Sequence, residues 1–294
     1  MSQTNLIQWC SQEVARSNLG WLGTHVDLDG EQIHFVEAGS GEPLVLIHGF
    51  MAWSFTWRHN LEALAQHARV MALDLRGFGL SAKNGGRPHS LSDQVEVLRA
   101  FLDARGVVRA VLCGHSMGGE VAFRFALQYP DRVKALILVS SSGYVYRNKS
   151  LVERLALRLP GVGNLFVRAM VLNRKFAGRT LRTAYRQAAT VTENDIEGYL
   201  LPARAPGAPG AFVAMLRDMD FGQTAQQIRA VSHKTLLIWG ENDPWIPVIH
   251  GRRMATELKG SRLVVFPECG HVPPEEHPDE FNRVVREYLQ SLDE

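Results

Sequence analysis

Short apolar runs alternate with longer segments of helical periodicity along most of the chain. Short aliphatic runs are typical of strands buried on both faces, whereas apolar residues spaced three and four apart indicate helices packed on a sheet. The pattern predicts strands within 43–49, 69–75, 109–115, 133–141, 234–240 and 261–270, and helices within 57–68, 89–106, 119–130 and 279–292. This alternation predicts an α/β fold with a mostly parallel sheet that helices cover on both faces.

Two local signals sharpen the ends of individual elements. Asp29 and Gly30 separate two strand-like runs within 25–39, which predicts a β-hairpin. Ser90 or Ser92 is expected to cap the start of the helix that follows. Both signals agree with the boundaries that the hydrophobic pattern predicts.

The regular alternation stops between about 143 and 218, where one helical segment follows another with breaks at proline and glycine. A helical insertion between two strands of a parallel sheet is typical of a lid. We therefore expect a core domain formed by 1–142 and 219–294 and a helical cap formed by 143–218. A short helix over 5–20 is expected to dock on the core.

Composition narrows the class of protein. The 294 residues are 46% apolar, which suffices for one large domain with an insertion. A net charge of +2 does not suggest a nucleic-acid binder. No apolar window is long enough to span a membrane, and the first residues do not form a secretory signal. Cys10, Cys113 and Cys269 lack the spacing of a disulfide framework or a metal site, so we expect a cytoplasmic protein.

The sequence GHSMG, at 114–118, lies between a predicted strand and a predicted helix. It fits the G-x-S-x-G pattern in the context that this pattern requires. A serine at such a sharp turn adopts a strained backbone conformation, and Gly114 and Gly118 allow the strand and the helix to approach closely. The positive end of the following helix favours negative charge that develops near Ser116. Ser116 is therefore the candidate nucleophile.

Five stretches in fixed order carry a resemblance to a known family: LIHGF, DLRGFGLS, GHSMGG, LLIWGENDPWIP and FPECGHVPPEEHP. Together they resemble the α/β-hydrolase fold superfamily, in its cap-bearing serine esterase branch, over about 24–290. The resemblance implies a doubly wound, mostly parallel eight-stranded sheet with a helical cap inserted after strand 6. It also implies a catalytic triad in the chain order serine, acid, histidine.

The resemblance assigns the other two triad positions. Asp243 matches the acid position after the strand within 234–240, with Glu241 as its near competitor. The acid would accept a hydrogen bond from an imidazole and hold it in one tautomer. His271 matches the base, because it follows the last predicted strand and an imidazole titrates near neutral pH.

Two backbone N–H groups complete the implied machinery. In the family, the residue after the early His-Gly pair donates its backbone N–H to the oxyanion, and in this chain that residue is Phe50. The second donor is the N–H of the residue after the nucleophile, here Met117. His48 is expected to bond within its own loop, and His115 to point away from the substrate. Asp74 is expected to brace the neighbouring loop.

Three positions of this chain differ from the residues that are typical of other branches of the family. Dehalogenases and epoxide hydrolases of this type use an aspartate nucleophile, where this chain has Ser116. Carbon–carbon-bond hydrolases of ring-cleavage pathways typically have Asn before the serine and Trp after the histidine, where this chain has His115 and Val272.

We therefore expect hydrolysis of carboxylic esters with short- to medium-chain acyl groups through an acyl-enzyme intermediate, with no metal or organic cofactor. One alternative is a carbon–carbon-bond hydrolase or lactonase of an aromatic-degradation pathway. Another is a catalytically silent ligand-binding protein of the same fold.

Three tryptophans are candidates for the substrate pocket. Trp53 and Trp57 follow the expected oxyanion loop, and Trp245 follows the expected acid. Packing in the core is the alternative for each of them. The apolar cap segment 151–172 is expected to form another wall of the pocket. The predicted partner is a small-molecule ester, with no nucleic acid and no integral membrane segment, and the chain is expected to be a monomer or a homodimer.

Overall fold

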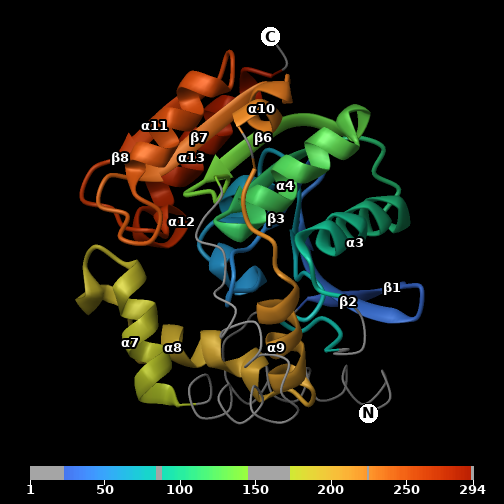
Figure 1. Ribbon diagram of the computed structural model, residues 1–294, viewed down its shortest axis with the longest axis vertical. Helices are drawn as coiled ribbons and strands as arrows, with labels where there is room; N and C mark the ends of the chain where they lie inside the picture. Colours follow the sequence, from blue (N-terminus) through green and yellow to red (C-terminus); the bar gives the residue numbers. More distant parts are fainter. Residues whose placement is uncertain (1–22, 84–87, 145–172, 224, 293–294) are drawn as a thin grey trace.

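The computed structural model describes residues 23–83, 88–144, 173–223 and 225–292. The predicted N-terminal helix over 5–20 and the cap segment 151–172 lie outside these residues. Within the described ranges, eight strands form one sheet in the order β1-β2-β4-β3-β5-β6-β7-β8 (Figure 1). The strands are β1 Thr24–Leu28, β2 Glu31–Ala38, β3 Pro43–Ile47, β4 Arg69–Leu73, β5 Ala110–His115, β6 Val133–Val139, β7 Thr235–Gly240 and β8 Arg262–Phe266.

The pairing directions confirm the expected eight-stranded, mostly parallel sheet. Strand β2 pairs antiparallel with β1 and with β4, and the remaining neighbours pair parallel. The predicted hairpin is β1–β2, in which Leu28 pairs with Glu31 across the turn. Each parallel connection requires a crossover, which explains the helices between the strands.

The helices surround the sheet. They are α2 Leu61–Ala65, α3 Leu91–Ala104, α4 Met117–Gln128, α7 Arg174–Ala184, α8 Glu193–Leu200, α9 Ala208–Asp218, α10 Ala225–Ala230, α11 Val248–Glu257, α12 Pro273–Glu276 and α13 Pro278–Gln290. In the described part of the chain, short 3-10 helices accompany them at Ser54–Trp57, Pro130–Arg132, Ala188–Thr190 and Leu201–Arg204. Helix α3 begins after Ser90, whose side chain and that of Asp93 form a capping box. Helix α2 is shorter than the predicted segment 57–68, because turns occupy residues 58–60 before it and 66–67 after it.

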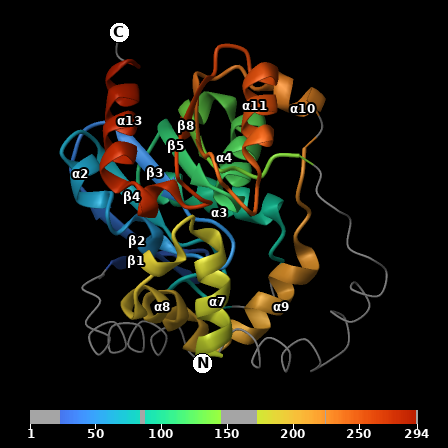
Figure 2. The ribbon, with the colours of Figure 1, turned by 90° about the vertical axis from the view of Figure 1, so that its left-hand side faces the viewer.

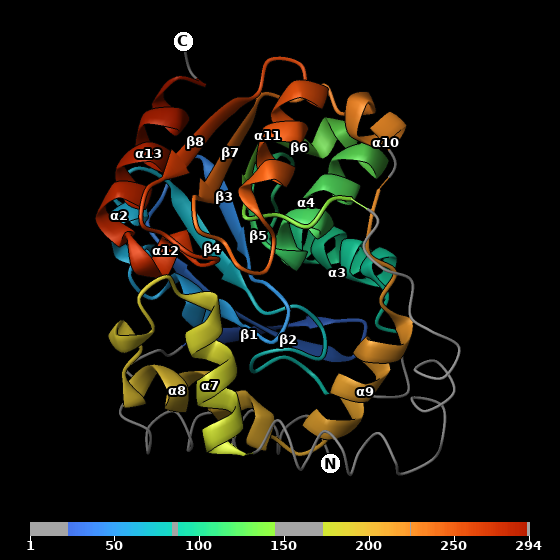
Figure 3. The same ribbon diagram turned by 60° about the vertical axis from the view of Figure 1, so that its left-hand side comes forward.

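Both faces of the sheet are buried. On β3, Val45 and Ile47 pack in one apolar cluster with α3, α4, α10 and α11, whereas Leu44 and Leu46 pack in a second cluster with α2 and α13. Figure 3 shows these two sets of helices on opposite sides of the sheet. The uninterrupted apolar runs in the sequence follow from this, because strands in the middle layer bury side chains in both directions.

Helices α7, α8 and α9 lie between β6 and β7 in the chain and gather at one end of the molecule (Figures 1 and 2). They face the loops that follow β3, β5, β7 and β8 across a common cavity. A hydrogen bond of 3.0 Å from Trp53 Nε1 to the carbonyl oxygen of Gly198 in α8 joins this insertion to the core. Among the described residues, no helix is both long and apolar enough to cross a membrane.

Candidate active site

Ser116 occupies a sharp turn between β5 and α4. Its φ is +52°, in a region that residues other than glycine rarely adopt, and its N–H donates to the Val139 carbonyl oxygen at 2.9 Å. A Cβ at Gly114 would lie 2.2 Å from the Gly118 carbonyl oxygen, and a Cβ at Gly118 would lie 2.2 Å from that of Ile47. Only glycine fits at both positions, so this turn has the geometry expected of a nucleophile elbow.

A buried polar cluster behind the turn was not anticipated from the sequence. The Ser142 N–H donates to the Ser116 carbonyl oxygen at 3.1 Å, and Ser142 Oγ donates to Glu120 Oε2 at 2.9 Å. Glu120 is fully buried and pairs with Arg124 one helical turn later at 2.9 Å. That i,i+4 acid–base pair on a helix was the one available signal, and it is common on solvated helix faces. Through Ser142, the cluster is hydrogen-bonded to the backbone of the turn.

Asp243 and His271 are in direct contact. Nδ1 of His271 lies 2.9 Å from Oδ2 and 3.0 Å from Oδ1 of Asp243, and both side chains are buried. Oδ1 also accepts the N–H groups of Trp245 at 2.9 Å and Ile246 at 2.8 Å. An imidazole whose Nδ1–H faces a carboxylate has Nε2 available as a proton acceptor. Glu241, the sequence competitor, is exposed.

His115 is one of the residues that line the cavity, and its side chain is buried. Its Nε2 lies 2.8 Å from the His271 carbonyl oxygen, and the two rings are 4.9 Å apart. Burial, with the neighbouring His271 ring, lowers the pKa of His115 to about 3. His115 is therefore neutral near neutral pH, and it ties the nucleophile turn to the loop of His271.

The low pKa of His115 predicts a loss of stability in acid. Below pH 6.5 the unfolded chain binds a proton at this residue that the folded chain does not bind. The free energy of unfolding should therefore fall as the pH decreases from 6.5 toward 3, by at most about 1.4 kcal/mol per pH unit. His115→Gln keeps a donor for the His271 carbonyl and should flatten this dependence by about one proton.

Urea unfolding of both proteins between about pH 4 and pH 7 measures this dependence. His48, whose pKa burial also lowers, is present in both proteins and contributes equally to both slopes. Identical slopes for the wild type and His115→Gln would contradict the assignment of a neutral buried imidazole.

The expected oxyanion loop follows β3. Phe50 and Met117 both line the cavity beside Ser116. Nδ1 of His48 donates to the Gly49 carbonyl oxygen at 2.8 Å, and Nε2 accepts the Leu75 N–H at 3.1 Å. His48 therefore bonds within its own loop and to the next one, as its place in the sequence indicates.

Asp74 holds the loops that follow β3 and β4 through hydrogen bonds to their backbone. Its carboxylate accepts the N–H groups of Ser54 at 2.6 Å and Leu80 at 2.8 Å, and it lies 2.8 Å from Nδ1 of His34. Burial opposes its charge, but His34 and the amide donors hold the pKa of Asp74 well below its usual range. The role is structural, since these partners are backbone groups and a core histidine.

A mostly apolar cavity of about 370 Å³ contains Ser116 and His271 in its wall. Helices α7, α8 and α9 supply Phe176, Leu181, Leu200, Phe212 and Met215 to this wall. Trp53 lines the cavity and is buried, whereas Trp245 lies at its rim, 42% exposed, with its ring 5.0 Å from that of His271. A cavity of this size and polarity suits a small apolar ligand with one reactive polar group.

Trp57, the third pocket candidate, lies elsewhere. Its side chain is fully buried and packs against Phe281 of α13, with ring centroids 6.0 Å apart. It belongs to the apolar cluster on the α2–α13 side of the sheet. For Trp57, the alternative of packing in the core therefore holds. Among the described residues, no group of His, Cys, Asp and Glu side chains has the arrangement of a metal site.

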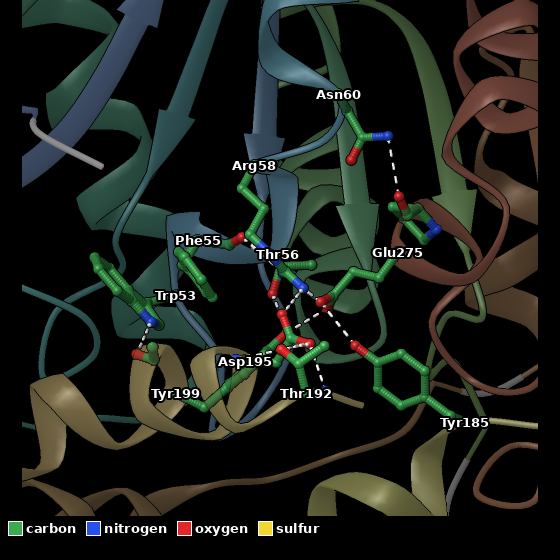
Figure 4. Close-up of polar contacts among 12 residues, drawn as sticks. Trp53, Phe55, Thr56, Arg58, Asn60, Tyr185, Thr192, Asp195, Tyr199 and Glu275 are labelled. Carbon is green, nitrogen blue, oxygen red and sulfur yellow. Dashed lines mark hydrogen bonds and ion pairs between the residues drawn. The ribbon is translucent and has the colours of Figure 1, made fainter. Parts of the chain in front are cut away.

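A second buried polar cluster links the insertion to the core beside the cavity. Glu275, in α12, accepts hydrogen bonds from Arg58, Tyr185 and Tyr199 (Figure 4). Arg58 also pairs with Asp195 of α8 at 2.7 Å. Burial opposes the charge of Arg58, but the neighbouring carboxylates, Glu275 foremost, raise its pKa above the ordinary value. The sequence carried no recognisable signal for this cluster, since its members lie far apart in the chain.

Comparisons with known proteins show the family of the chain. The family model described as alpha/beta hydrolase fold matches residues 42–278. The chain is 31% identical to the pimeloyl-[acyl-carrier protein] methyl ester esterase of Nitrosomonas europaea, over 85% of this chain and 96% of that protein. It is 29% identical to the 2-hydroxy-6-oxo-2,4-heptadienoate hydrolase of Pseudomonas putida, over 92% of this chain and 98% of that protein. A solved structure of a thermophilic esterase from Thermogutta terrifontis superposes with a TM-score of 0.75 at 28% identity, over 92% of this chain and 97% of that chain.

Proposed function

Because the chain belongs to the alpha/beta hydrolase fold family, we propose that it hydrolyses carboxylic esters through an acyl-enzyme intermediate on Ser116. The observation that carries the proposal is one cavity whose wall contains both the strained Ser116 and His271, with His271 bonded to Asp243. We also propose that residues 1–142 and 219–294 form the core domain and that residues 143–218 form a helical cap.

In the proposed reaction, Ser116 Oγ attacks the ester carbonyl carbon while His271 Nε2 takes its proton. The N–H groups of Phe50 and Met117 stabilise the oxyanion, and Asp243 stabilises the imidazolium that forms. His271 then protonates the alcohol as its bond to the carbonyl carbon breaks. In the second half of the reaction, His271 takes a proton from water, the water oxygen attacks the acyl carbonyl carbon, and Ser116 Oγ leaves with the proton that His271 returns. Each step is a proton transfer, an addition to the carbonyl or an elimination from the tetrahedral intermediate, so the proposed mechanism requires no metal or organic cofactor.

The cavity supports a limit on the size of the substrate. At about 370 Å³ it lies near the lower end of the roughly 300–1,000 Å³ typical of ligand sites. With nitrophenyl esters, we expect the highest kcat/KM for butyrate to octanoate and at least about a tenfold lower value for palmitate, because burying each further CH₂ requires space that this cavity lacks. Steady-state rates with soluble nitrophenyl esters of increasing chain length test this, and a palmitate ester that is cleaved fastest would contradict it.

A second candidate is hydrolysis of a carbon–carbon bond, which similarity to the heptadienoate hydrolase favours. Against it stand His115 and Val272, which both line the cavity where the ring-cleavage enzymes typically carry Asn and Trp. Purified protein offered an ester panel, a lactone panel and ring-cleavage diketones separates the candidates. Turnover of diketones with no ester hydrolysis would replace the first proposal by the second, and binding without turnover of any substrate would favour a silent ligand-binding protein.

A further inference from the structure

The loop that carries His271 is bonded through its main chain to the end of α7. The His271 N–H donates to the Ala184 carbonyl oxygen at 2.7 Å, and the Arg186 N–H donates to Glu276 Oε2 at 2.7 Å. The other oxygen of Glu276, Oε1, accepts the Gly270 N–H at 2.8 Å. One short segment of the insertion thus holds the loop both at His271 and, through Glu276, at the residue before it.

Tyr185, which lies between Ala184 and Arg186 in the chain, makes a third contact through its side chain. Tyr185 donates its hydroxyl to Glu275 Oε2 at 2.8 Å. Glu275 also accepts from the Tyr199 hydroxyl of α8 and from Arg58 of the core (Figure 4). A single carboxylate, four residues after His271, therefore joins two tyrosines of the insertion to an arginine of the core.

This contact is buried and specific. The side chain of Glu275 is fully buried, and that of Arg58 is 12% exposed. Burial, with the facing Glu275 carboxylate, raises the pKa of the Tyr185 and Tyr199 hydroxyls, so both remain donors near neutral pH. Oε2 of Glu275 accepts from both Arg58 and Tyr185, and Oε1 accepts from Tyr199. A buried carboxylate that loses one of these donors is less well stabilised, so the arrangement resists displacement.

We propose that residues 184–186, Glu275 and Glu276, together the clasp, are a positioning cluster by which the insertion holds His271 in place for Ser116. The proposal rests on the proposed ester hydrolysis. The cavity wall, as far as the described residues form it, does not include Tyr185, Glu275 or Glu276. They would therefore act through His271 and not on the substrate.

A cluster that positions the base should affect kcat rather than KM. For nitrophenyl butyrate, Tyr185→Phe should lower kcat roughly tenfold and Glu275→Gln up to about 100-fold, because small displacements of a catalytic group slow the chemical step. KM should change less than about twofold in both variants. Phe212→Ala, which enlarges the cavity, should instead raise KM.

Matched controls come from a tyrosine–glutamate pair remote from the cavity. The hydroxyl of Tyr129, which follows α4, donates to Oε1 of Glu96 in α3 at 2.6 Å, and neither residue is among those that line the cavity. Tyr129→Phe and Glu96→Gln make the same chemical changes and should leave kcat and KM unaltered. Tyr185→Phe is the milder clasp variant, and it keeps the test decisive if Glu275→Gln does not fold.

Amide hydrogen exchange provides a readout that does not depend on activity. Tyr185→Phe should accelerate exchange in 268–277 and leave α3 unchanged, because the hydrogen bonds to the loop are weakened locally. Unchanged exchange in 268–277 would overturn the clasp, whether or not the wild type hydrolyses esters. A lowered unfolding midpoint with unaltered kcat, or a raised KM like that of Phe212→Ala, would also overturn it. A wild type that cleaves no ester would instead refute the proposed function, and hydrogen exchange would still decide whether the clasp holds the loop.

Discussion

Ser116→Ala is expected to lower kcat/KM for nitrophenyl butyrate by at least about 10⁴-fold. The substitution removes the only atom proposed to form the acyl-enzyme bond, and no other side chain replaces it at the turn. The backbone donors of Phe50 and Met117 remain, so a small residual rate above the uncatalysed reaction should persist. Alanine lacks only the hydroxyl, and the turn's backbone bonds to Val139 and Ser142 do not involve that group.

An unchanged unfolding midpoint would show that the loss of activity is chemical and not structural. In parallel, an active-site-directed organophosphonate should add once to the wild type, at Ser116, and not at all to the variant, as intact-mass spectrometry and peptide mapping would show. Ser142 also lines the cavity. Labelling of Ser142, or retention of full activity by Ser116→Ala, would refute the assignment of the nucleophile.

Asp243→Asn is expected to lower kcat by about 10³- to 10⁴-fold while the fold is kept. An asparagine Oδ1 can still accept the Trp245 and Ile246 N–H groups, so the loop geometry should survive. Its amide nitrogen, however, would face Nδ1 of His271 as a donor. The imidazole would then favour the tautomer with hydrogen on Nε2, which cannot accept the serine proton.

Steady-state kinetics of Asp243→Asn beside Glu241→Gln tests the assignment of the acid. Glu241 is the neighbouring exposed carboxylate, so its amide variant should retain wild-type rates. If Glu241→Gln loses activity and Asp243→Asn does not, the acid has been assigned to the wrong residue.

Much of the core was predictable because its signals are local. The strand runs, the hairpin at Asp29 and Gly30, and the helix that begins after Ser90 are set by short-range periodicity and capping. The turn at Ser116 was also predictable, because the close approach of β5 and α4 leaves room for glycine alone. The locations of Asp243 and His271 came from a family resemblance, and the structure places their side chains in contact.

Other features depend on packing between distant segments. Trp53 and Trp57 are four residues apart and both are buried, yet only Trp53 lines the cavity, whereas Trp57 packs against Phe281 of the distant helix α13. The contact of His115 Nε2 with the His271 carbonyl oxygen joins residues that lie 156 positions apart in the chain. Neither outcome has a signature in the nearby sequence.

By itself, the amino-acid sequence determined the α/β class and the strand–turn–helix around Ser116, because both follow from local periodicity, steric limits and a short motif. The chain order of the proposed catalytic groups came from the family resemblance. Only the tertiary structure decided which walls enclose the cavity and how the insertion meets the loop of His271. Glu275 illustrates the reason: its partners Arg58, Tyr185 and Tyr199 lie 217, 90 and 76 residues away along the chain. Buried polar contacts over such separations form only when the whole fold desolvates them together.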